Sequence, residues 1–101
     1  MGVTKAGRHY AREPFKIWRN AAVAEIRRQM PSQWIPIAEP CNVRLIYVAG
    51  DRRRRDMPAV IDAIWHVLEK AGVVADDTLL WIAHSTREYS AANPHALIMF
   101  L

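Results

Sequence analysis

The chain has 101 residues, the size of one domain, and its 51% hydrophobic and 24% charged composition excludes a disordered chain and predicts a packed core. Its 14 Lys and Arg against 10 Asp and Glu give a net charge of +4. Most of these basic residues are arginine, whose planar guanidinium suits phosphate recognition. A polyanionic partner is therefore favoured, with a merely basic protein as the alternative.

Cysteine, histidine and hydropathy patterns exclude several other classes of protein. The single Cys41 excludes an intramolecular disulfide and a cysteine-based zinc site, and it predicts a reducing compartment. The four histidines lack a spacing such as H-x-x-x-H, which argues against zinc altogether. No apolar run approaches the roughly 20 residues that cross a bilayer, and the first residues lack the apolar segment of a secretion signal. We therefore expect a soluble, cytoplasmic protein without membrane association.

Two segments open the chain. Residues 1–12 are rich in glycine and basic residues and show no periodicity, so we expect a mobile basic arm. Pro14 suits the first turn of a helix, and the apolar residues after it recur at helical spacing up to Pro31. These apolar residues are Phe15, Trp18, Ala22, Ile26 and Met30. Residues 31–40 hold three of the six prolines, which predicts an irregular connection.

A strand, a basic turn and a second helix follow. Residues 43–48, "VRLIYV", are β-branched, aromatic and apolar on nearly both faces, as in an inner strand. The four arginines 52–55 come next, and Asp56 is a good N-cap for a helix that stops at Gly72, a natural C-terminal glycine. The apolar stripe of this helix consists of Val60, Ile61, Ile64, Trp65, Leu68 and Ala71.

Two strands complete the chain. Residues 78–85 and 95–101 are apolar and β-rich, and residues 86–94 between them contain an Asn-Pro turn signal. We therefore predict a single α+β domain over residues 1–101, with two helices packed on a mixed β-sheet of three to four strands. The tryptophans that lie in the apolar patterns, Trp18, Trp65 and Trp81, are expected in the core.

Acidic residues flank the second helix at both ends. Asp56 and Asp62 lie at its start, and Asp76 and Asp77 follow its end. The helix spans about 24 Å, and five extended residues after Gly72 retrace about 17 Å if they fold back along it. The remaining gap of about 7 Å is one that two carboxylates and a cation can bridge. This geometry permits a single metal site that includes all four aspartates.

The segment "DRRRRD", the helix after it, "EKAGVVADD" and the two closing strands resemble the RusA-type crossover junction endodeoxyribonucleases, the small Holliday junction resolvases of bacteria and their phages. The resemblance runs from about Val43 to the end, with a weaker similarity in "GRHY" and "FKIW". It implies a homodimer that cuts four-way DNA junctions with Mg²⁺, held by aspartates of an Asp-x-Asp-Asn-x-x-Lys motif and of a later Asp-Asp pair. Asp56 matches the first aspartate, and Asp76 and Asp77 match the pair, with Asp77 as the ligand.

The middle of the motif departs from this pattern. Pro58 stands at the second aspartate, Ala59 at the asparagine and Asp62 at the lysine, and the chain begins near the family's first loop, so we expect an initial edge strand to be missing or shortened. A lost ligand weakens a hard-cation site, and a lost lysine removes a charge that assists cleavage. Asp62 lies one helical turn from position 58 and is a candidate replacement ligand. The alternative is that Asp62, His66 and Lys70 form an ordinary solvated helix face.

The resemblance and the basic residues leave two main functions and a third, weaker one. The first is a Mg²⁺-dependent endonuclease that resolves four-way junctions in DNA recombination and repair, and the second is a weakened relative that binds branched DNA without cutting it. The third is an interaction protein that binds no nucleic acid. The predicted DNA-binding residues are Arg52, Arg53, Arg54, Arg55, Lys5, Arg8 and Arg12.

Overall fold

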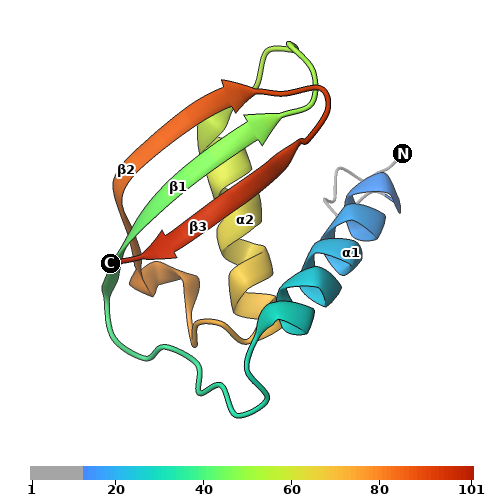
Figure 1. The fold of residues 1–101 in the computed structure, drawn as a ribbon. Coiled ribbons are helices and arrows are strands. Elements are labelled where there is room, and N and C mark those ends of the chain that lie inside the picture. The colour runs from blue at the N-terminus through green and yellow to red at the C-terminus, as the bar shows by residue number, and fades with distance from the viewer. Residues whose placement is uncertain (1–12) are drawn as a thin grey trace, which may run out of the picture.

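The computed structural model describes residues 13–101, and each helix and strand expected in this range forms (Figure 1). In chain order the elements are α1 (Glu13–Gln29), β1 (Cys41–Ala49), α2 (Met57–Ala71), the short 3₁₀ helix η1 (Asp77–Leu79), β2 (Leu80–Tyr89) and β3 (His95–Phe100). β2 continues four residues beyond the predicted strand end at position 85, so the connection to β3 is shorter than expected. The basic arm, with Lys5, Arg8 and Arg12, lies outside the described residues.

Within residues 13–101 the sheet has three strands in the order β2-β1-β3, which confirms the predicted mixed sheet. β1 pairs in parallel with β2 and antiparallel with β3. A parallel pair needs a long crossover connection, and α2 provides it between β1 and β2. In Figure 1, α2 lies behind the sheet and α1 lies to its side, beyond β3. The predicted α+β domain is thus correct, with α2 on one face of the sheet and α1 packed against α2.

The core forms between the inner face of β1 and the apolar stripe of α2. Val43 and Leu45 of β1 and Val67 of α2 are fully buried, and Val23 carries α1 into the same cluster. Full burial of such a side chain contributes about 1.5–3 kcal/mol. The expectation for the tryptophans is correct only for Trp65, because Trp18 and Trp81 are 44% and 61% exposed. Trp81 is exposed because Leu80 before it takes the buried face of the sheet, which leaves Trp81 beside the exposed Asn42 on the other face. Trp18 is exposed because α1 lies to the side of the sheet.

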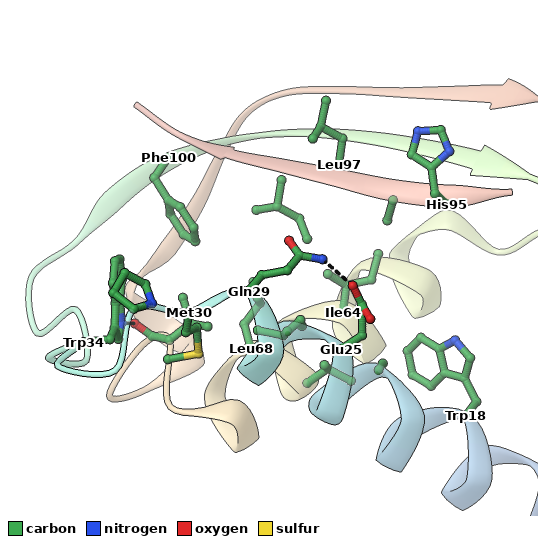
Figure 2. A pocket seen from close by; sticks show the side chains of 17 residues that line it. Trp18, Glu25, Gln29, Met30, Trp34, Ile64, Leu68, His95, Leu97 and Phe100 are labelled. Carbon is green, nitrogen blue, oxygen red and sulfur yellow. Dashed lines mark hydrogen bonds between the residues drawn. The ribbon is translucent and has the colours of Figure 1, made fainter. Parts of the chain in front are cut away.

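An open cavity separates α1 from β3. It has a volume of about 560 Å³ and mainly apolar walls, and Trp34, Met30 and Phe100 lie toward one end of it (Figure 2). Trp18 and His95 lie toward the other end. Within residues 13–101, no helix combines the length and the apolar character that a membrane span needs.

Candidate metal centre and nucleic-acid interface

Three carboxylates gather at the C-terminal end of α2. One oxygen each of Glu69, Asp76 and Asp77 lies within 4.8 Å of the others. Glu69 lies in the last turn of α2, Asp76 caps η1 and Asp77 begins it. The Asp77 backbone N–H donates to Glu69 Oε1 over 3.0 Å, which fixes the start of η1 against the helix. We call Glu69, Asp76 and Asp77 the acidic cluster.

Gly72 makes this arrangement possible. Its φ of 87° is in the left-handed region that glycine adopts without strain. The chain therefore reverses at the end of α2 and returns past Glu69 into η1. The "EKAGVVADD" segment contains this signal, a helix-ending glycine between Glu69 and the aspartate pair, but Glu69 was not among the predicted site residues.

The acidic cluster has the donor chemistry of a hard-cation site. Carboxylate oxygens are the ligands that Mg²⁺ prefers, at 2.0–2.1 Å, so two ligands of one ion lie up to about 4.2 Å apart. The separations within 4.8 Å need only a small side-chain rotation to reach that value. The pKa of the Asp76 carboxyl is lowered because the carboxylate accepts hydrogen bonds from the Thr78 backbone N–H, at 2.9 Å, and from the Thr78 hydroxyl, at 2.8 Å. The residues present therefore fit a divalent cation.

Asp56 and Asp62 lie away from the acidic cluster. Asp56 precedes α2, and the 13 residues from it to Glu69 span about 20 Å along the helix axis. Asp62 precedes Glu69 by seven residues, or about 10 Å. The predicted single site of four aspartates is therefore not formed within one copy of the chain. Asp62, His66 and Lys70 are all exposed, as the alternative of a solvated helix face predicted.

The reason for this separation lies in the residues after α2. A single site required residues 73–75 to fold back along the helix, but they pair with the Pro-rich connection instead. The Ile37 N–H donates to the Val73 carbonyl over 2.9 Å, and the Ala75 N–H donates to the Ile37 carbonyl over 2.8 Å. A parallel bridge joins Ile37 and Val74. This pairing holds Asp76 and Asp77 at the C-terminal end of α2.

The arginine turn, residues 51–56, lies at the other end of α2, and Arg55 holds it in place. Arg55 forms an ion pair with Asp51 at 3.0 Å and donates from Nε to the Tyr47 hydroxyl oxygen at 3.3 Å. These two interactions, that with Tyr47 foremost, raise the pKa of Arg55. The pKa of the Asp51 carboxyl is lowered, chiefly because it accepts the Arg53 backbone N–H. The Arg55 side chain is 22% exposed, so it is the structural arginine of the turn.

The other three arginines are presented to solvent. The Arg52 guanidinium lies over the Tyr89 ring, 4.8 Å from its centroid. The side chains of Arg53 and Arg54 are exposed and make no hydrogen bond or ion pair within residues 13–101. Asp56 occupies the predicted N-cap position of α2, but its side chain makes no capping hydrogen bond. The turn thus offers guanidinium groups that are available for phosphate contacts.

The chain matches a known nuclease. No family model matches it, but it is 28% identical over 81 residues to the "Crossover junction endodeoxyribonuclease RusA" of Aquifex aeolicus (strain VF5). The chain is similar to RusA. This similarity covers 80% of the chain and 63% of the relative, so the chain spans somewhat less than two thirds of the RusA protein that it matches. The RusA-type resemblance inferred from "DRRRRD" and "EKAGVVADD" is thereby confirmed as a distant similarity.

Proposed function

We propose that the chain is a RusA-like endonuclease that binds four-way DNA junctions and hydrolyses their phosphodiester bonds with Mg²⁺. The observation that carries this proposal is the acidic cluster, three carboxylates within 4.8 Å of one another in a chain that is similar to a RusA nuclease. The presented guanidinium groups of the arginine turn support DNA contact. Residues Glu69, Asp76 and Asp77 would hold the cation.

Each residue then has a defined task. When bound, a divalent cation lowers the pKa of water and neutralises charge on phosphate oxygens. The hydrogen bonds from Thr78 keep Asp76 ionised and fix its orientation. Arg53 and Arg54 hold DNA phosphates, and Arg55 keeps the turn in the conformation that presents them.

The position of Asp56 supports a homodimer in which each site is shared. One helix separates Asp56 from Asp77 by about 20 Å, so the two can meet only if they belong to different copies. A two-fold dimer that sets the start of α2 in one copy beside the end of α2 in the other brings Asp56 and the arginine turn to the acidic cluster. Such a dimer has two equivalent sites, which suits two coordinated cuts in a four-stranded junction.

Subunit mixing tests the shared site. Asp56→Asn and Asp77→Asn are each expected to lower junction cleavage by homodimers about a hundredfold, whereas refolding them together in equal amounts restores native-like cleavage at one site of each mixed dimer. If the site lies within one copy, every site in the mixed dimer keeps one defect and cleavage stays at the level of the single variants. Light scattering that gives a monomer with and without junction DNA contradicts the dimer itself.

The second candidate function is binding of branched DNA without cleavage. The observation in its favour is that Pro58 stands in the motif and that Asp62, the candidate replacement, lies about 10 Å from Glu69 along α2. Binding and cleavage assays on a synthetic four-way junction, with and without Mg²⁺ or Mn²⁺, separate the two functions. Tight binding with no cleavage in either metal supports the second, and absence of binding supports an interaction protein unrelated to DNA.

A further inference from the structure

A second cavity lies directly beside the arginine turn. It has a volume of about 510 Å³, within the range of about 300–1,000 Å³ usual for ligand pockets. Arg55 of the turn and Gly50 just before the turn line it, together with the first residues of β3. A Cβ at Gly50 would lie 3.1 Å from Pro94, so the glycine permits the close approach that brings His95 to the cavity.

Aromatic rings form much of the wall. Phe15 and Trp18 come from one face of α1, and their ring centroids are 5.7 Å apart with planes at 38°. They are 37% and 44% exposed, although both are large apolar side chains. Tyr47 of β1 adds a third ring. Rings of this kind are the surfaces on which unpaired bases stack in proteins that bind single strands.

Polar groups with free hydrogen-bonding capacity lie among these rings. The Tyr47 hydroxyl oxygen accepts from Arg55, so its own proton is available to another acceptor. His95 Nδ1 lies 2.8 Å from the Asn93 carbonyl oxygen, to which it donates, and this leaves Nε2 available. Apolar walls with a few placed polar groups are the usual pattern of a site for a flat heteroaromatic ligand.

We propose that this cavity receives one unstacked nucleobase of the DNA strand whose phosphates the arginine turn holds. The inference rests on the proposed function, which supplies branched DNA as the substrate. Base and phosphate belong to one nucleotide, and the cavity adjoins the arginine turn at Arg55, which follows Arg53 and Arg54 directly in the chain. Where the exchange point of a junction is opened and a base loses its stacking partner, extruding that base requires less free energy than extruding a base from a continuous duplex.

The experiment measures binding of a four-way junction that carries 2-aminopurine at the exchange point, with the same probe in the middle of one arm for comparison. Native protein is expected to change the fluorescence of the exchange-point probe only. Phe15→Ala combined with Trp18→Ala is expected to abolish this change and to weaken junction binding at least about fivefold, the lower end of the effect of losing a stacked base. Trp18→Phe keeps an aromatic ring and is expected to retain the signal. Trp81→Ala is the matched control, because Trp81 is exposed and lies outside the cavity.

Several results overturn the inference. The first is that native protein binds the junction without changing the fluorescence of the exchange-point probe. The second is that the double variant weakens binding of the junction and of a continuous duplex equally. Loss of the dimer in the double variant shows that a second copy covers the cavity, and it also contradicts the proposal. Circular dichroism checks that the variants fold. If the double variant does not fold, the fluorescence change with Trp18→Phe still tests the base site, because loss of that change contradicts the proposal. If native protein binds no DNA, the proposed function is refuted. If junction binding is unchanged by the Phe15→Ala and Trp18→Ala double variant, only the base site is refuted.

Discussion

The two ends of α2 differ in charge and in how their side chains are held. At its start, Arg55 is fixed by Tyr47 and Asp51 while Arg53 and Arg54 project to solvent. At its end, the acidic cluster is fixed by the hydrogen bond between Asp77 and Glu69. About 20 Å of helix separates the two ends.

This separation exceeds the Debye length of about 8–10 Å in physiological salt. The arginine turn therefore does not neutralise the acidic cluster of its own copy. A rigid helix keeps apart two charged segments that are close in sequence.

The largest expected effect is the loss of cleavage rate when residues of the acidic cluster, at the C-terminal end of α2, are replaced. Asp77→Asn and Glu69→Gln each remove an anionic ligand, and each is expected to lower the cleavage rate about a hundredfold, or 2.7 kcal/mol of barrier. Asp62→Asn is the matched control, with less than about a tenfold effect because Asp62 lies about 10 Å from Glu69 along the helix. Mg²⁺ titrations and single-turnover cleavage provide the measurements. Equal effects of Asp62→Asn and Asp77→Asn would show that Asp62 is the replacement ligand.

The next effect concerns the basic end. Replacing Arg53 and Arg54 with Ala is expected to weaken junction binding and to reduce the slope of log affinity against log salt by about 1.8, since each lost duplex phosphate contact removes about 0.9. Arg55→Ala is expected to lower the melting temperature more than the double variant does, because Arg55 holds the turn. An unchanged salt slope in the double variant would assign the contacts to Lys5, Arg8 and Arg12.

A smaller effect is expected at Gly72, which connects the helix to the acidic cluster. Gly72→Ala costs about 1 kcal/mol of folding free energy, because a Cβ is strained at a φ of 87°. In the described part of the chain no heavy atom beyond the neighbouring residues lies within 4 Å of the added Cβ, so steric contact there contributes nothing further. Gly72→Asn is the control, since asparagine tolerates the left-handed region better. Thermal unfolding measures the stability of both variants. Equal stabilities of Gly72→Ala and Gly72→Asn would contradict backbone strain as the cause.

The smallest effect is on the pH dependence of stability. The pKa of Asp76 is lowered below 3.8 in the folded chain, so its contribution is present above the unfolded value and is lost as the pH falls through the folded value. Asp76→Asn does not titrate and is expected to show a smaller loss of melting temperature between pH 5 and pH 2. Asp51→Asn is the parallel test at the basic end, where Arg53 lowers the pKa. Identical pH profiles for native protein and both variants would show that neither carboxylate contributes.

The sequence predicted local structure well because local physics fixes it. The period of apolar residues located both helices, and the β-branched run 43–48 lies in the central strand. Asp56 and Gly72 marked the ends of α2 within one residue. The end of β2 was missed because Thr86 to Tyr89 are mostly exposed and owe their strand conformation to pairing with β1, which no local pattern reveals.

The amino-acid sequence also showed which residue types the candidate site offers: a block of arginines, an aspartate pair, and Pro58 where the RusA-type pattern has an aspartate. Which of these residues lie together depends on tertiary contacts. Pairing of residues 73–75 with Ile37 and the reversal at Gly72 place Asp76 and Asp77 beside Glu69 and keep them from Asp56. The reversal at Gly72 is a local signal, whereas the pairing with Ile37 joins segments distant in sequence, so the pattern of residues around Asp76 and Asp77 does not reveal it.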